Sequence, residues 1–72
     1  MTLEKYKKQI GQNLKDARKK SGLRQIDIEE KIGLTYRYYQ TIEAGRANVT
    51  IKTLYELSKL FKTPVEALVK VK

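Results

Sequence analysis

The segment Thr35–Ala44 places an unusual set of side chains on one helix face. Side chains that recur every three to four residues share a face, and this one collects donors, acceptors and one cation with little flexible Lys or Glu. The face consists of Tyr36, Arg37, Gln40, Thr41 and Ala44. It suits a helix in the DNA major groove, where base edges present donors, acceptors and methyl groups. The first four of these residues are therefore the base-reading candidates.

Each candidate has a chemical role and an ordinary alternative. The Arg37 guanidinium can bond guanine O6 and N7 at the same time. Tyr36 can pack on a thymine methyl group or bond a phosphate, and Gln40 and Thr41 can reach the same groove. All four are also compatible with a plain solvated surface. Because three tyrosines of this segment lie close together, and exposed Tyr is enriched at protein interfaces, a protein-interaction module of the antitoxin or co-regulator kind is the alternative function.

The net charge narrows the kind of partner. Sixteen Lys and Arg residues against eight Asp and Glu residues give +8 in 72 residues. Such an excess attracts a polyanion, but nucleic acid, an acidic membrane and an acidic protein all meet that description. A chain of this length is expected to form one small domain, residues 1–72, around a single core.

The composition argues against catalysis and against a bound metal. The chain has no Cys and no His, so it lacks the usual zinc and iron–sulfur ligands and cannot form a disulfide, which fits a reducing cytoplasm. Only Ser21 and Ser58 are serines, and no nucleophile–base set is evident. We therefore expect no enzyme activity, cofactor, metal or small-molecule ligand.

The hydropathy of the chain argues against a membrane protein. No stretch is long and apolar enough to span a bilayer, and the N-terminus lacks the apolar core of a signal peptide. The expected location is the cytoplasm, in association with the nucleoid.

The elements that carry the candidate residues are all predicted to be helical. Periodicity, caps and turn residues predict a compact five-helix, all-α domain, with helices at about residues 3–21, 24–32, 35–44, 50–61 and 64–69. Thr2, Thr35 and Thr50 are the predicted N-caps. Thr63 and Glu66 form a predicted capping box at the last helix.

The apolar positions of these helices predict one shared core. Gly11 lies inside the first helix at a cost of about 1 kcal/mol relative to Ala, so it is expected to mark a close approach to another helix. Ile26 is expected on the surface, either as a tolerated apolar residue or as part of a partner contact. The lysines of the first helix are expected to form a solvated face that steers a polyanion. The residues expected to point inward are Leu3, Tyr6, Ile10, Leu14, Ala17, Ile28, Ile32, Tyr39, Ile42, Ile51, Leu54, Leu57, Phe61, Val65, Leu68 and Val69.

Short motifs along the chain support a family resemblance. The most specific are Gly-Leu-x-Gln at 22–25, Ile-Gly-Leu-Thr at 32–35 and Ile-Glu-x-Gly at 42–45. Over residues 10–69 the chain resembles the Cro/C1-type helix-turn-helix family, also called the XRE family. The VTIKTL segment and the final Thr-Pro helix also resemble the restriction–modification controller proteins of that family. The resemblance implies a lambda-repressor-like domain with its helix-turn-helix in the second and third helices.

The resemblance also implies a function and a set of contacts. Family members are mostly sequence-specific transcriptional regulators, and they commonly bind double-stranded DNA as homodimers on paired half-sites. The residue matching Gln25 contacts the DNA backbone and braces the recognition helix. The phosphate-contacting candidates are Arg24, Gln25, Thr35, Tyr38, Arg46, Asn48 and Lys52.

Two structural expectations follow from the same resemblance. Arg18 and Glu43 fall on inward faces, and the family often pairs these positions in a buried salt bridge. The likeliest homodimer seam is the region of the fourth and fifth helices, whose spare apolar groups are Tyr55, Leu60, Val69 and Val71.

The chain departs from the family pattern at three positions. Arg24 stands where a Ser or Thr cap is usual, and Arg cannot accept the capping hydrogen bond. Glu29 and Tyr39 stand where the family has Ala and a branched aliphatic residue. Two larger side chains at this contact should spread the helices or turn one side chain outward. A hydrogen bond from the Tyr39 hydroxyl to the Glu29 carboxylate is the predicted solution.

Overall fold

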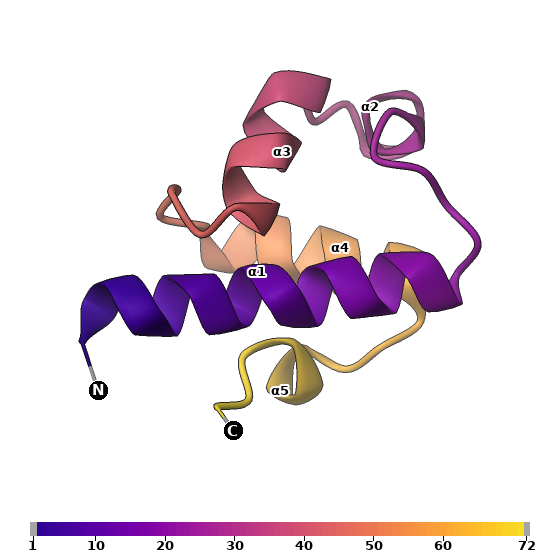
Figure 1. Ribbon diagram of the computed structural model, residues 1–72. Helices are drawn as coiled ribbons and strands as arrows, with labels where there is room; N and C mark the ends of the chain where they lie inside the picture. Colours follow the sequence, from indigo (N-terminus) through magenta and orange to yellow (C-terminus); the bar gives the residue numbers. More distant parts are fainter. Residues whose placement is uncertain (1, 72) are drawn as a thin grey trace.

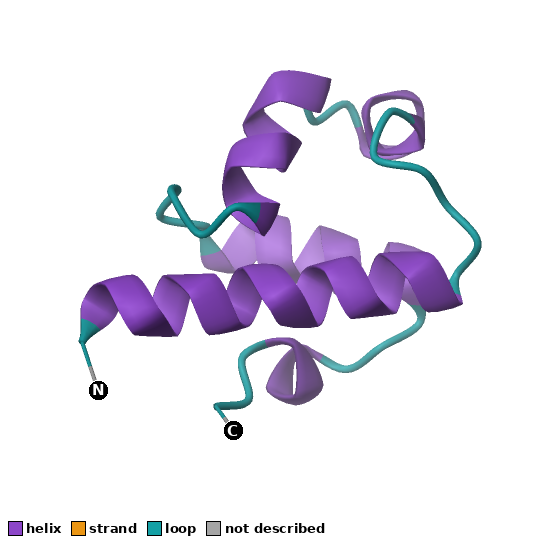
Figure 2. Cartoon of the chain, viewed as in Figure 1, coloured by secondary structure: helices purple, strands orange, loops and turns teal. Residues whose placement is uncertain are grey.

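The computed structural model describes residues 2–71, and all of its regular structure in that range is helical (Figure 1, Figure 2). Helix α1 crosses the middle of the molecule, with α2 and α3 on one side, α5 on the other and α4 behind it (Figure 1). The all-α, five-helix prediction is confirmed. The helices of the described residues are α1 (Leu3–Lys20), α2 (Asp27–Ile32), α3 (Tyr36–Glu43), α4 (Ile51–Phe61) and α5 (Val65–Leu68).

Threonine side chains begin three of the helices, as predicted. The hydroxyl oxygens of Thr2, Thr35 and Thr50 each accept a backbone N–H from the first turn of α1, α3 and α4, at 3.2 Å in every case. Such a bond satisfies one of the donors that a helix start leaves free. The start of α3 is therefore fixed by local sequence.

Helix α2 begins at Asp27, later than the predicted start at residue 24. The residues before it form a turn in which the Asp27 N–H donates to the Arg24 carbonyl at 3.1 Å. The Asp27 carboxylate accepts the Arg24 backbone N–H at 2.8 Å. Since Arg24 has no side-chain acceptor, α2 starts without a side-chain cap, and the Asp27 carboxylate instead holds the turn that leads into the helix.

The predicted capping box of the last helix is wrong. Helix α5 starts at Val65 with Pro64 as its N-cap, and it has no side-chain cap. Because the start lies one residue later than predicted, the Thr63 hydroxyl is out of register and donates to the Phe61 carbonyl at 3.1 Å. The segment is held on α1 by Asn13, whose amide donates to the carbonyls of Leu68 and Lys70 at 2.9 and 2.8 Å.

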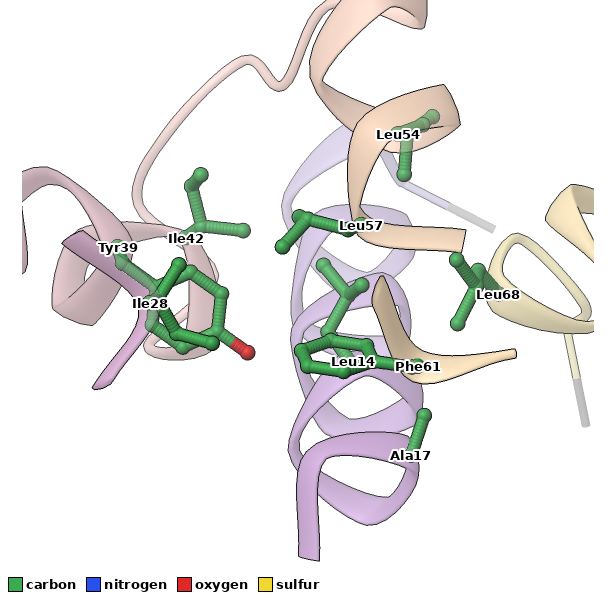
Figure 3. Packing of buried hydrophobic residues seen from close by; sticks show 9 residues of the cluster. All are labelled: Leu14, Ala17, Ile28, Tyr39, Ile42, Leu54, Leu57, Phe61 and Leu68. Carbon is green, nitrogen blue, oxygen red and sulfur yellow. The ribbon is translucent and has the colours of Figure 1, made fainter. Parts of the chain in front are cut away.

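The core is one cluster to which all five helices contribute (Figure 3). Three of the predicted inward residues do not join it: Leu3 is 63 % exposed, Tyr6 37 % and Ile51 83 %. They lie in the first turns of α1 and α4, where no other helix covers the apolar face. The buried cluster consists of Leu14, Ala17, Ile28, Tyr39, Ile42, Leu54, Leu57, Phe61 and Leu68.

Gly11 marks the crossing of α1 and α3, as predicted. A Cβ at this position would lie 2.5 Å from the Glu43 carbonyl oxygen and 2.7 Å from that of Ile42. Both atoms are backbone, so only a glycine lets α3 approach α1 this closely. The contact at Gly11 therefore fixes how closely α3 packs against α1.

Candidate nucleic-acid interface

The two sides of α3 have opposite environments. Tyr39 and Ile42 are buried in the core, whereas Tyr36, Arg37 and Gln40 are exposed and Thr41 is half-buried. The predicted outward set therefore does lie on the solvent side of the helix.

The outward side chains are partly ordered by contacts among themselves. The Gln40 amide donates to the Tyr36 hydroxyl at 3.0 Å, one helical turn away. The Thr41 hydroxyl donates to the Arg37 carbonyl at 2.8 Å, which leaves its lone pairs as acceptors. Arg37 is the one cation on this face of α3, and its side chain extends into solvent.

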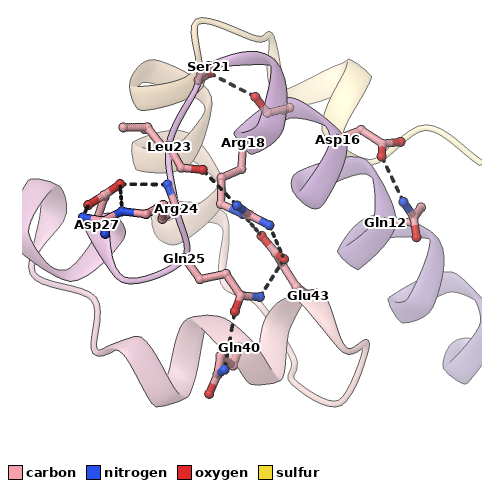
Figure 4. Close-up of polar contacts among 11 residues, drawn as sticks. Gln12, Asp16, Arg18, Ser21, Leu23, Arg24, Gln25, Asp27, Gln40 and Glu43 are labelled. Carbon is pink, nitrogen blue, oxygen red and sulfur yellow. Dashed lines mark hydrogen bonds and ion pairs between the residues drawn. The ribbon is translucent and has the colours of Figure 1, made fainter.

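A hydrogen-bonded chain connects this outward side to the interior (Figure 4). The Gln40 amide donates to the Gln25 side-chain oxygen at 3.4 Å, and the Gln25 amide donates to Glu43 Oε1 at 2.9 Å. Glu43 Oε2 in turn accepts from Arg18 Nε at 2.7 Å. Gln25 thus braces α3 from the segment before α2.

The ion pair at the inner end of this chain is buried, as predicted. The side chains of Arg18 and Glu43 are 10 % and 4 % exposed. Arg18 also donates through Nη1 to the Leu23 carbonyl at 2.8 Å. The hydrogen bond with Glu43 raises the pKa of Arg18 above its usual value, so the guanidinium stays charged. This contact joins α1 to the end of α3.

The predicted bond between Tyr39 and Glu29 is wrong. The Tyr39 side chain is completely buried, and within the described residues its hydroxyl has no hydrogen-bond partner. Burial, and next the nearby Glu43, raises the pKa of Tyr39, so the hydroxyl stays neutral. Glu29 turns outward and accepts the Tyr36 backbone N–H at 2.9 Å. The crowding is relieved because one side chain fills the core and the other leaves it.

Two surface hollows flank the outward ridge of α3. One, of about 260 Å³, is lined by Arg37, Gln40, Thr41, Ala44 and Arg46. The other, of about 330 Å³, lies toward α1 and is lined by Lys15, Gln25, Gln40, Glu43 and Ala44. A helix in the major groove has a sugar–phosphate backbone on each side, and each hollow contains a cationic side chain.

Lys15 is the residue of this surface that sequence reasoning assigned elsewhere. It was expected on a solvated steering face of α1, but it lines the hollow beside Gln25 and Gln40. Its position three residues before the inward Arg18 was the available signal, since residues three apart share a helix face.

The other predicted phosphate-contacting residues lie around α3 in different states. Arg24 is exposed, but its guanidinium pairs with Asp27 at 3.0 Å. The Thr35 hydroxyl is used in the cap of α3, and Tyr38 packs half-buried against the core. Three further candidates are exposed in the loop after α3 and the first turn of α4, namely Arg46, Asn48 and Lys52.

Of the four apolar residues of the predicted dimer seam, two are exposed to solvent and two pack against the core. Tyr55 is 53 % exposed and Val71 41 %, whereas Leu60 and Val69 are half-buried against the core. Ile26, expected on the surface, is 54 % exposed.

Within residues 2–71, every helix is too short or too polar to span a bilayer. The same residues contain no group of three or more acidic side chains that could hold a metal ion.

Comparisons with known proteins agree with this geometry. A family model described as helix-turn-helix matches residues 14–68, which include all five core-forming segments. The chain is also 38 % identical over 53 residues to an uncharacterised HTH-type transcriptional regulator, y4dJ, of Sinorhizobium fredii, with 74 % of this chain and 69 % of the relative covered. The chain therefore belongs to the Cro/C1-type (XRE) helix-turn-helix family of DNA-binding transcriptional regulators.

Proposed function

We propose that this protein is a sequence-specific regulator of transcription that binds double-stranded DNA with α3 in the major groove. The observation that carries the proposal is the division of α3, whose outward side is free while its inner side is locked by Arg18, Glu43 and Gln25. The relative y4dJ is named a transcriptional regulator, which supports a role in regulation. Such a protein works in the cytoplasm, at the nucleoid.

The outward residues have complementary tasks in this proposal. Arg37 bonds the O6 and N7 atoms of a guanine, and Gln40 can bond the N6 and N7 atoms of an adenine. Tyr36 and Thr41 supply apolar contact to thymine methyl groups. The Gln40 amide nitrogen already donates to both Tyr36 and Gln25, so a bond to adenine N7 replaces one of these two contacts.

Phosphate contacts supply most of the affinity and fix the register. Arg46 borders one hollow beside α3 and Lys15 the other, which supports a contact of each with one backbone of the groove. The remaining contacts are assigned to the exposed residues Arg24, Asn48 and Lys52 and to the half-buried Gln25 and Tyr38. The Thr35 hydroxyl serves the cap of α3 and is left out of this set. The net charge of +8 attracts the duplex before these contacts form.

We further infer a homodimer that binds paired half-sites. Tyr55 of α4 and Val71, which follows α5, provide exposed apolar surface. A two-fold axis there would set the half-sites about 34 Å apart, one turn of DNA. Selection of bound sequences from a random duplex pool would reveal this spacing as a repeated motif.

The alternative, a tyrosine-rich protein-binding face, has less surface than its sequence suggested. Tyr39 is buried in the core and Tyr38 packs against it, so among the three tyrosines of α3 only Tyr36 is exposed, at 38 %. An interaction face normally relies on several exposed aromatic rings.

A salt titration of duplex binding tests the proposal. Neutralising about four to six phosphates predicts a slope of roughly −4 to −5 in a plot of log K against log salt for each bound monomer. A flat response would instead favour the protein-partner function.

Substitution of Arg37 tests the base-reading part. Arg37→Ala should weaken binding to the selected sequence by about 5- to 150-fold, because a good bidentate pair contributes roughly 1–3 kcal/mol of discrimination. The affinity for a random duplex should fall much less. The control is Lys70→Ala, which removes the same charge just after α5, the helix that lies across α1 from α3 (Figure 1). Equal losses on both duplexes would reassign Arg37 to phosphate contact.

A further inference from the structure

Glu29 holds both ends of the turn between α2 and α3. Its backbone carbonyl accepts the Gly33 N–H at 2.9 Å, which closes α2 at a residue with φ of 75°. Its side-chain Oε1 accepts the Tyr36 N–H, also at 2.9 Å. Glu29 is therefore bonded both to Gly33, the C-cap of α2, and to Tyr36, the first residue of α3.

These bonds change what the start of α3 can bind. The first backbone N–H groups of a helix lack partners within the helix and attract anions such as phosphate. Here the Tyr36 N–H is taken by Glu29 and the Tyr38 N–H by the Thr35 hydroxyl. A carboxylate thus occupies the anion-attracting start of α3, directly beside Tyr36 and Arg37.

We propose that Glu29 is a positioning and specificity residue of the DNA interface. Resting on the proposed function, this inference assigns Glu29 two effects. Its hydrogen bond fixes the start of α3, so that the outward side chains meet the bases in one register. Its charge keeps phosphates off the start of α3, which prevents a sequence-independent docking in which a phosphate would pin the helix.

The two effects are separable because two substitutions remove different parts of the group. Glu29→Gln removes the charge but keeps a side-chain oxygen that can accept the Tyr36 N–H. Glu29→Ala removes both. Glu66→Gln is the control for net charge, since Glu66 is an exposed residue of α5, across α1 from α3 (Figure 1).

The experiment measures the affinities of the wild type and these three variants for a selected duplex and a random duplex at several salt concentrations. Glu29→Gln should keep its affinity for the selected duplex and bind the random duplex about two- to fivefold more tightly, the range expected for a charge at a helix end. Glu29→Ala should gain at least as much on the random duplex and also lose affinity for the selected one. Glu66→Gln should leave the ratio of the two affinities unchanged.

Several results would overturn the inference. Unchanged affinity ratios in both Glu29 variants would remove any role in specificity, and equal effects of Glu29→Gln and Glu66→Gln would reduce the effect to net charge. If Glu29→Gln lost affinity for the selected duplex, the acceptor role would be excluded, because this variant keeps the acceptor oxygen. This part of the test does not depend on whether Glu29→Ala folds. If the wild type bound no duplex in a salt-dependent manner, the proposed function would fail together with the inference. Wild-type binding with unaltered variants would reject Glu29 alone.

Discussion

The polar groups on the inner and outer sides of α3 differ in their hydrogen bonding and in their exposure to solvent. On the inner side, Glu43 is bonded to both Arg18 and Gln25, and the Arg18–Glu43 pair is withdrawn from water. On the outer side, Arg37 is exposed and bound to nothing in the described residues except through its backbone. The inner contacts fix where the helix stands, and the outer groups remain available. One helix therefore serves stability on one side and recognition on the other.

The largest effect should come from breaking the inner ion pair. Glu43→Ala leaves the Arg18 guanidinium buried without its carboxylate, which should lower the free energy of unfolding by about 3–5 kcal/mol. Urea denaturation followed by circular dichroism measures the loss. Arg37→Ala on the outer side is the matched control and should stay within about 0.5 kcal/mol of the wild type. Similar losses for both variants would break the division between the two sides.

A smaller effect on stability is expected at the Gly11 crossing, which fixes the distance between α1 and α3. Gly11→Ala adds a Cβ 2.5 Å from the Glu43 carbonyl oxygen, so α3 must move away from α1. Overpacking of this kind costs about 1–3 kcal/mol, more than the roughly 1 kcal/mol that Ala gains over Gly in a helix. Chemical denaturation should show a net loss, and duplex binding should weaken as α3 shifts. A Gly11→Ala variant more stable than the wild type would show that the contact between α1 and α3 can accommodate a Cβ.

Removal of the Tyr39 hydroxyl should change stability in the opposite direction. The group is buried without a partner, and such a group costs about 1–3 kcal/mol. Tyr39→Phe should therefore raise the free energy of unfolding, by about 1 kcal/mol once the small void is allowed for. Tyr55→Phe, with an exposed ring, should be neutral. A clear loss in Tyr39→Phe would mean that the hydroxyl supports the Arg18–Glu43 pair.

The smallest effect concerns the exposed pair at the entry to α2. The Arg24 guanidinium, and next its backbone N–H, holds the pKa of Asp27 below the ordinary value of 3.8. A lowered folded-state pKa stabilises the fold above the ordinary pKa, and this contribution is lost as the pH falls through the folded-state value. The stability difference between wild type and Asp27→Asn should be constant well above the ordinary pKa of 3.8 and shrink as the pH falls below it. A difference independent of pH would show that the Asp27 charge is not involved.

Local sequence determined most of the helices and the exposed face of α3. Thr35 caps the helix and periodicity separates Tyr36, Arg37 and Gln40 from Tyr39 and Ile42, because both signals act within one or two turns. The pairing of Arg18 with Glu43 was also predictable, through the family resemblance and two inward faces.

Tertiary structure alone decided the features that depend on what lies opposite a residue. Leu3 and Ile51 have inward periodicity but no helix covers them, since a helical period defines a face and not its cover. Tyr39 and Glu29 exchanged the expected contact for burial and a bond to the next helix. The hollow that contains Lys15 arises where α1 meets α3, and spacing within one helix cannot specify such a meeting.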